Sequence, residues 1–270
     1  MTRIAGTLAL ITGASSGIGA ACARRFAAQG ARLVLWARRV DRLETLAAEL
    51  RKAHGTEVGI AEVDVRDREA VLEAGRALVE SGGGRGGKGD AGGVPDILLN
   101  NAGLASGLSK LQEGDFEDWD KMIDTNIKGV LNVSRSLLPH MVTRGTGHVV
   151  NIGSTAGHMV YPGGNVYNAT KYALRALNEG MNLDVAGTAI RVSSVDPGFV
   201  ETEFSEVRFH GDKAQAKAVY RGFTPLSADD VADAIAYVVN LPPHVNILDL
   251  VMMPTAQRNI YVVDRAPERA

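Results

Sequence analysis

The N-terminal stretch of the chain alternates an apolar strand, a glycine-rich turn, a helix and a second apolar strand. The first apolar run, Thr7 to Thr12, ends at Gly13, and a helical pattern of small and apolar residues continues to Gly30. The next apolar run, 32–36, follows at once. A strand, a helix and a strand of these lengths form a parallel pair joined by a crossover helix. This unit therefore restricts the chain to the α/β folds.

Three glycines lie between the first strand and its helix. Gly13, Gly17 and Gly19 have the spacing Gly-x-x-x-Gly-x-Gly, which differs from the dinucleotide fingerprint Gly-x-Gly-x-x-Gly. The physics is the same, because glycine lets the backbone approach a pyrophosphate at a helix N-terminus, where free amides and the helix dipole favour anions. Glycine turns also occur without a ligand, so the motif by itself leaves both interpretations open.

The same alternation continues towards the C-terminus. Helical patterns, including a long one from about Asp115 to Arg144, separate further apolar runs that predict strands at 57–63, 96–99, 148–152, 189–195 and 246–251. We therefore expect one doubly wound α/β domain over residues 1–270. Two stretches depart from the pattern. The glycine-rich run 82–93 is predicted to be a flexible surface loop, and 200–224, which lacks clean periodicity, is predicted to be a mobile substrate lid.

The residues after the second strand favour NADP over NAD. In dinucleotide-binding folds an acidic side chain at this position bonds the ribose 2′-hydroxyl of NAD, whereas arginine accommodates the 2′-phosphate of NADP. Here Ala37 is followed by Arg38 and Arg39. The alternative is that one of these arginines only covers the surface of the next helix.

Polar residues follow the third and fourth strands. Asp64 either faces the adenine or serves as a turn residue before the next helix. Asn100 and Asn101 either line a ligand crevice or tie neighbouring strands together. Asn126 lies inside the long helical pattern close to Gly129, where both residues are locally unfavourable, and such violations are expected at functional sites.

A serine, a tyrosine and a lysine are the candidate catalytic groups. Ser154 follows the strand 148–152, and Tyr167 and Lys171 lie four residues apart where the next helical pattern begins. On a helix this spacing places both side chains on one face. An ammonium favours a neighbouring phenolate, so we expect Lys171 to lower the pKa of Tyr167 and make it an acid/base near neutral pH. A structural tyrosine and a surface lysine are the alternative.

Composition excludes several classes of protein. The net charge is −2, which provides no basic excess for nucleic acid or for an anionic membrane surface. The one cysteine, Cys22, excludes an intrachain disulfide. We find neither a signal-peptide pattern nor an apolar run of membrane-spanning length, so we expect a cytoplasmic protein. We expect a small-molecule substrate and no metal.

The chain resembles the short-chain dehydrogenase/reductase family over nearly its whole length. The resemblance is carried by blocks in the family's order: Thr12-Gly13-x-x-x-Gly17-Ile18-Gly19, Asp64-Val65, Asn100-Asn101-Ala102-Gly103, Asn126, Ser154, Tyr167-x-x-x-Lys171 and Asp196-Pro197-Gly198. It implies a Rossmann domain whose seven parallel strands have the order 3-2-1-4-5-6-7 with helices on both faces, NAD(P) at the carboxyl edge of the sheet, and a homotetramer.

The family also implies roles for individual residues. Tyr167 exchanges a proton with the substrate, Lys171 supports it and holds the nicotinamide ribose, and Ser154 bonds the substrate oxygen. Asn126 completes the tetrad by seating a water that relays protons. The implied cofactor contacts are Gly13, Ser15, Ser16, Gly17, Ile18, Gly19, Arg38, Arg39, Asp64, Val65, Asn101, Ala102, Gly103, Tyr167, Lys171, Pro197, Gly198, Val200 and Thr202.

Within the family, three stretches look like the NADP-dependent 3-hydroxy acid dehydrogenases: 152–157, 203–209, and 241–247 with Met252-Met253-Pro254. This implies that the chain interconverts a serine-like or 3-hydroxypropionate-like acid and its 3-oxo or semialdehyde product. The substrate would lie against Ser154 and Tyr167, and Arg208 would grip its carboxylate, unless Arg208 is merely an exposed lid residue. Two other functions stay open: a carbonyl reductase of the same family acting on other ketones or alcohols, and a non-catalytic NADP-binding protein.

Overall fold

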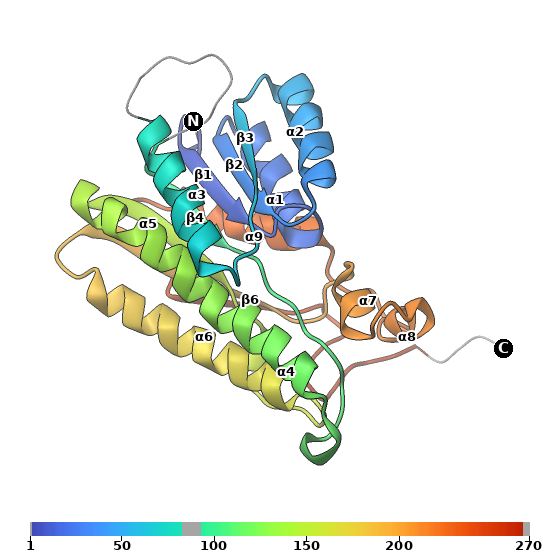
Figure 1. Ribbon diagram of the computed structural model, residues 1–270. Coiled ribbons are helices and arrows are strands. Elements are labelled where there is room, and N and C mark those ends of the chain that lie inside the picture. The colour runs from blue at the N-terminus through green and yellow to red at the C-terminus, as the bar shows by residue number, and fades with distance from the viewer. Residues whose placement is uncertain (1, 83–92, 267–270) are drawn as a thin grey trace.

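The computed structural model describes residues 2–82 and 93–266 (Figure 1). The strands are β1 (Leu8–Thr12), β2 (Arg32–Ala37), β3 (Val58–Glu62), β4 (Ile97–Asn100), β5 (Thr146–Ile152), β6 (Ala189–Pro197) and β7 (Asp249–Met252). The α-helices are α1 (Gly17–Ala28), α2 (Val40–His54), α3 (Arg68–Ser81), α4 (Phe116–Ile123), α5 (Val130–Arg144), α6 (Asn165–Asp184), α7 (Phe204–Arg208), α8 (Lys213–Ala218) and α9 (Ala228–Asn240). Short 3-10 segments lie at η1 (Leu111–Glu113) and η3 (Thr155–Gly157).

All seven strands join one parallel sheet in the order β3-β2-β1-β4-β5-β6-β7. This confirms the expected α/β class, the doubly wound sheet and its strand order. The last strand begins later than the pattern 246–251 predicted, because Asn246 reaches β6 through its side chain, whose amide donates to the Val192 carbonyl at 3.0 Å. Regular pairing with β6 starts only at Asp249, opposite Ser194.

Two helical layers cover the sheet, with α1, α2 and α9 on one face and α3, α5 and α6 on the other (Figure 1). Alternate residues of each strand point to opposite layers, as the pleat of a strand requires. In β1, Ala9 and Ile11 pack with the first layer, and Leu8 and Leu10 pack with the second. Because both faces are buried, the strands are apolar almost throughout, as the sequence indicated.

The carboxyl ends of the parallel strands lie along one edge of this sheet. The chain leaves β1 towards β2 on one side and returns to β4 on the other, so the helices that follow them cover opposite faces. A crevice forms where the winding reverses in this way, and open α/β sheets bind their ligands there. The fold therefore brings together the polar residues that follow each strand.

The predicted helix from about Asp115 to Arg144 is continuous in the chain but not regular. Between α4 and α5 the segment Asp124–Gly129, which contains Asn126, is a π-helix. A wider turn of this kind accommodates residues that a regular α-helix disfavours, and π-turns occur frequently at functional sites. The residues that are unfavourable in a regular helix, Asn126 and Gly129, thus lie in an irregular turn.

The segment 200–224, called the lid below, contains the short helices α7 and α8 beyond the carboxyl edge of the sheet (Figure 1). That it is mobile and covers the substrate stays a prediction. The glycine-rich run 82–93 lies outside the described residues except at its two ends, so the flexible loop stays a prediction. Among the helices of the described ranges, none combines the length and the apolar character needed to cross a membrane.

Candidate functional site

A cleft of about 330 Å³ lies at the carboxyl edge of the sheet. It is lined from the first strand end to the lid by the residues expected to contact a dinucleotide, with the exception of Gly19. The lining residues that had been expected are Gly13, Ser15, Ser16, Gly17, Ile18, Arg38, Arg39, Asp64, Val65, Asn101, Ala102, Gly103, Ser154, Tyr167, Lys171, Pro197, Gly198, Val200 and Thr202. Sites for small ligands and cofactors have this size and concave shape.

The glycine turn at one end of the cleft depends on glycine for two different reasons. Gly13 and Gly17 have φ values of +64° and +54°, which side-chain-bearing residues rarely adopt. Gly19 lies behind the cleft, where a Cβ would come within 2.5 Å of the Gly13 carbonyl oxygen and 2.6 Å of Asn101 Nδ2. Gly19 is not among the residues that line the cleft, and its lack of a side chain allows α1 to pack closely on the turn; its contact with the cofactor stays a prediction.

The N-terminus of α1 faces this turn with its first amides uncapped. Ser16 precedes the helix in an extended conformation, and its side chain makes no capping hydrogen bond. Arg39 donates from Nη2 to Ser16 Oγ at 2.7 Å and from Nε to Ser15 Oγ at 3.3 Å. Open helix amides beside a guanidinium form an anion-binding corner.

An acidic residue of the lid faces the same corner. Glu203 accepts hydrogen bonds from Arg39 Nη1 at 2.9 Å and from Arg42 Nη1 at 2.6 Å. The hydrogen bond from Arg42 is the largest cause holding the pKa of Glu203 at about 2, so this carboxylate is ionised. Arg38 lines the cleft beside them.

Asp64 and Asn101 line the cleft and also hold the local backbone in place, whereas Asn100 links strands. Asp64 lines the cleft, and it also closes a turn by accepting the Arg66 backbone N–H at 3.0 Å. Asn101 lines the cleft while its amide donates to the Thr12 carbonyl at 2.9 Å, which ties β4 to β1. Asn100 is buried and donates to Asn151 Oδ1 at 2.9 Å, so it links β4 to β5.

Ser154 and Tyr167 meet in the middle of the cleft. Ser154 caps η3 by accepting the Ala156 N–H at 3.1 Å, and both Ser154 and Tyr167 line the cleft, where the Ser154 hydroxyl lies near the Tyr167 phenol. Tyr167 is only 7% exposed. Burial raises the pKa of Tyr167, and although Arg208 and the hydrogen bond to Ser154 oppose the rise, they do not cancel it.

Lys171 follows Tyr167 on the same face of α6, as the spacing predicted. Its ammonium donates to the Ile152 carbonyl at 2.8 Å and lies 5.9 Å from the centre of the Tyr167 ring. Burial lowers the pKa of Lys171 to about 8. The expectation that Lys171 lowers the pKa of Tyr167 is wrong for this structure, because desolvation of the phenol outweighs every nearby charge and the ammonium is directed towards a backbone carbonyl.

Asn126 lies beside the catalytic candidates but does not line the cleft. Its amide makes three hydrogen bonds: Oδ1 accepts the Leu104 N–H at 2.9 Å, and Nδ2 donates to the Leu104 carbonyl at 2.8 Å and to Thr170 Oγ1 at 3.0 Å. The side chain therefore joins the loop after β4 to α6. Both amide hydrogens are used, so a relay water could bind this amide only by donating to the second lone pair of Oδ1.

Arg208 projects from α7 towards Tyr167. Its guanidinium carbon lies 5.1 Å from the Tyr167 ring centre and 5.5 Å from the Tyr161 ring centre, and Nη2 donates to the Tyr161 hydroxyl. Its Nε is buried and has no hydrogen-bond partner. A buried unpaired donor on a cation is costly, but Arg208 is not among the residues that line the cleft, so an anionic ligand would reach this Nε only if the side chain moves.

The sequence interpretation missed several residues around the cleft. Phe204 packs edge-on against Tyr167 with ring centres 5.7 Å apart, and Glu203 and Val207 also line the cleft from the lid. The other additional lining residues are Ala37, Val63, Leu104, Thr125, Ile152 and Gly153. Tyr161, the partner of Arg208, carries no motif. Only its position next to Pro162-Gly163-Gly164, a sharp corner just before Tyr167, could have indicated it.

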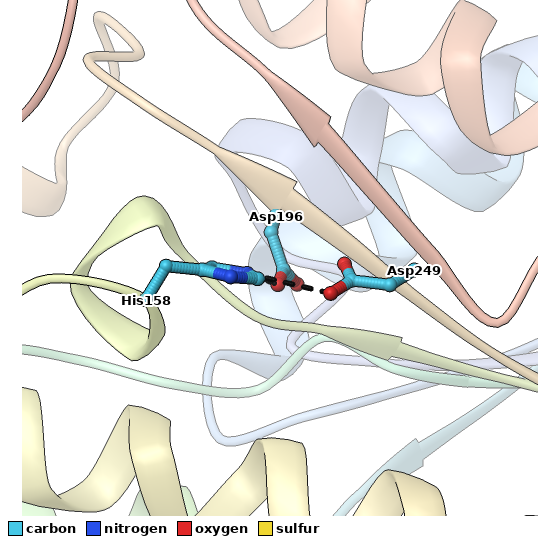
Figure 2. A group of neighbouring side chains, drawn as sticks. All are labelled: His158, Asp196 and Asp249. Carbon is cyan, nitrogen blue, oxygen red and sulfur yellow. Dashed lines mark hydrogen bonds and ion pairs between the residues drawn. The ribbon is translucent and has the colours of Figure 1, made fainter.

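A cluster of three titratable side chains lies at the carboxyl end of β6, beside the cleft (Figure 2). His158 follows η3, Asp196 is the penultimate residue of β6 and Asp249 begins β7. His158 Nε2 lies 2.5 Å from Asp196 Oδ2 and 3.5 Å from Asp249 Oδ2. The imidazole therefore lies within ion-pair distance of both carboxylates.

The chain is similar in sequence to known oxidoreductases. A family model described as short chain dehydrogenase matches residues 7–213. The NADP-dependent 3-hydroxy acid dehydrogenase YdfG of Escherichia coli K12 is 43% identical over 251 residues, covering 93% of this chain and 96% of the relative. Sulfoacetaldehyde reductase 2 of Chromohalobacter salexigens is 45% identical over 260 residues, covering 96% of this chain and 98% of the relative.

Solved structures agree with this similarity. The closed form of serine dehydrogenase complexed with NADP+ superposes with a TM-score of 0.86 at 42% identity, covering 96% of this chain and 99% of that one. Serine dehydrogenase from Escherichia coli gives a TM-score of 0.76 at 39% identity, covering 93% and 99%.

Proposed function

This chain belongs to the short-chain dehydrogenase/reductase family, and we propose that it interconverts a small 3-hydroxy acid and its 3-oxo or semialdehyde product. The coarser activity follows from the family and from its NADP-dependent relatives: the chain is an NADP-dependent oxidoreductase that acts on hydroxyl groups. The proposal adds the substrate class and the roles of individual residues.

The residues at one end of the cleft fit NADP. The uncapped amides of α1 and the glycine turn suit a pyrophosphate, because the backbone there lies open without side chains. Arg38 and Arg39 suit the 2′-phosphate. NADP supplies the hydride acceptor and, when reduced, the hydride donor. The protein residues bind it, orient it and exchange the accompanying proton.

Tyr167 is the proposed acid/base. Its phenol lies near the Ser154 hydroxyl in the cleft, so a substrate oxygen bound between the two hydroxyls would be held and protonated at one point. In reduction Tyr167 gives its proton to the carbonyl oxygen, and in oxidation the phenolate takes it from the hydroxyl. The raised pKa of Tyr167 favours the protonated phenol, which is the form needed for reduction.

We infer the substrate class from the position of Arg208. Its Nε is buried without a partner, and its guanidinium lies 5.1 Å from the Tyr167 ring centre. An anion bound there would lie a few ångströms from the phenol, which matches an acid group separated by one or two carbons from the reacting carbon. A neutral ketone would leave the buried Nε unpaired, so the site favours acids over uncharged substrates.

A sulfonate is the second candidate for the same position. Sulfoacetaldehyde carries its anionic group one carbon from the carbonyl, as a 3-oxo acid does, and two relatives named sulfoacetaldehyde reductase are each 45% identical to the chain. Carboxylate and sulfonate both accept hydrogen bonds from a guanidinium, so Arg208 does not by itself distinguish them.

A substrate panel tests the proposal. We expect NADP reduction with 3-hydroxypropionate, 3-hydroxyisobutyrate or serine, followed by nicotinamide absorbance, at a kcat/KM at least tenfold above that for the uncharged alcohol 1-propanol. Isethionate, the alcohol of sulfoacetaldehyde, identifies the second candidate if it exceeds the carboxylates. Equal rates with charged and uncharged alcohols would contradict the proposed substrate class.

We further propose that the protein acts in the cytoplasm as a homotetramer. Exposed apolar side chains on the long helices support the assembly: Leu131 on α5 is 46% exposed, and Tyr172 and Leu183 on α6 are 40% and 74% exposed. Such side chains on neighbouring helices favour helix packing between subunits. Light scattering on the purified protein would measure the mass of the assembly.

A further inference from the structure

Asp196 has a buried carboxylate for which the proposed mechanism has no use. Its side chain is 3% exposed, and Oδ2 lies 2.5 Å from His158 Nε2. Ser194 donates its hydroxyl to Oδ1, and the Asp249 carboxylate lies beside that of Asp196, with their oxygens within 4.8 Å. Figure 2 shows the imidazole and the two carboxylates meeting from three separate segments. Burying a carboxylate is costly even when it is well paired, so the position of this group is informative.

The Asp196 carboxylate lies directly against the floor of the active site. A Cβ added to Gly153 would overlap Asp196 Oδ1, so the carboxylate packs on the Cα of that residue. The residues on either side of Gly153 hold the reacting groups. The Ile152 carbonyl accepts a hydrogen bond from the Lys171 ammonium at 2.8 Å, and the Ser154 side chain lies near Tyr167 in the cleft.

The negative charge of Asp196 raises the pKa of both Lys171 and Tyr167. Burial lowers the pKa of Lys171 to about 8, and the negative charge of Asp196 opposes that fall. The same charge helps to raise the pKa of Tyr167, of which burial is the main cause. A charge in a buried region acts over several ångströms because little solvent screens it.

We propose that Asp196 is a positioning residue, which keeps Lys171 in its ammonium form and supports the segment Ile152–Ser154 from behind, with His158 and Asp249 holding its carboxylate. This inference rests on the proposed function, since it takes Tyr167 and Lys171 as the groups that act in proton transfer.

Other charged groups face the cluster from α6. Arg175 Nε lies 4.0 Å from Asp249 Oδ2 and 3.6 Å from Glu179 Oε1, so Asp249 is only partly neutralised from that side. Burial, followed by the charge of Asp196, raises the pKa of Asp249 to about 6. Asp249 therefore takes up a proton near pH 6 and is ionised above that pH, in the range where Lys171 acts as an ammonium.

The test is the pH dependence of kcat/KM for NADPH-dependent reduction in the Asp196→Asn variant. Lys171 is charged below its pKa of about 8 and neutral above it. We therefore expect kcat/KM of the wild type to decrease as the pH rises through about 8, and this decrease is the basic limb of the profile. Removing the charge of Asp196 lowers the pKa of both Lys171 and Tyr167, and we expect the limb to move down by about 0.5 to 1 pH unit. The matched control is Asp233→Asn on α9, whose side chain is 57% exposed, and it should leave the profile unchanged.

A second variant covers the case in which Asp196→Asn does not fold. Asp249 is 29% exposed at the edge of the sheet, and Asp249→Asn should shift the limb in the same direction by a smaller amount. A purely structural role would reduce activity equally at every pH. An unmoved limb, or one displaced to higher pH, in the folded variant overturns the inference.

Tyr167→Phe, measured in parallel, separates the two proposals. If it is inactive while the Asp196→Asn limb stays in place, only the role of Asp196 fails. If Tyr167→Phe keeps normal turnover, the proposed proton transfer fails.

Discussion

The two ends of the cleft are built in different ways. The cofactor end consists mainly of backbone: the turn at Gly13 and Gly17 and the uncapped N-terminus of α1. The substrate end consists of side chains from separate segments, and the bond between Arg208 and Tyr161 joins residues 47 positions apart. Substitutions at the first end should therefore act on folding and cofactor binding, and substitutions at the second end on turnover and substrate choice.

The largest expected effect is at the substrate end, in Tyr167→Phe. Loss of the hydroxyl removes proton transfer but keeps the ring that packs on Phe204. We expect turnover to fall by about 10²- to 10⁴-fold, with the Kd for NADPH nearly unchanged. Steady-state kinetics and a fluorescence titration with NADPH measure the two quantities, and near-normal turnover would remove Tyr167 from its proposed role.

Arg208→Ala should change substrate preference more than fold. Loss of a charge-assisted hydrogen bond to an anion should lower kcat/KM for 3-hydroxypropionate by roughly 10- to 100-fold, with little change for an uncharged alcohol. Arg258→Ala is the control, because Arg258 is 61% exposed and pairs only loosely with Asp264, at 3.6 Å. An equal loss with charged and uncharged substrates would mean that Arg208 acts through packing.

At the cofactor end, Gly19→Ala should destabilise the fold. The new Cβ would meet the Gly13 carbonyl and the Asn101 amide at 2.5 and 2.6 Å, and overpacking of this kind costs about 1 to 3 kcal/mol. Gly180→Ala on α6 is the matched control, because its Cβ meets nothing within 4 Å and alanine favours a helix. Thermal unfolding should show a lower Tm for the first variant and an equal or higher Tm for the second.

The smallest expected effect is a change of cofactor preference in Arg38→Asp. A carboxylate beside the 2′-phosphate position repels NADPH and suits the ribose of NADH. We expect NADPH affinity to fall about tenfold, with NADH affinity falling much less. Titrating both cofactors decides this, and an equal loss of the two would show that the 2′-phosphate is bound elsewhere, for example by Arg39 and Arg42.

Much of the fold was predictable from the sequence because it depends on local patterns. Apolar runs and glycine turns predicted the alternation of strands and helices, and the family resemblance supplied the strand order β3-β2-β1-β4-β5-β6-β7. The irregularity at Asn126 was also visible, as a polar residue and a glycine in a helical pattern. The helices of the lid were missed, because α7 and α8 have only five and six residues and carry no clear periodicity.

The sequence by itself determined the parallel sheet, the backbone cradle and the spacing of Tyr167 and Lys171, since these depend on residues close together in the chain. Only the tertiary structure decided how those groups are charged. It buried Tyr167 and so raised its pKa, directed Lys171 to the Ile152 carbonyl, and placed Asp196 behind Gly153. Burial and long-range charge depend on what packs around a group from distant segments, and no local pattern records that.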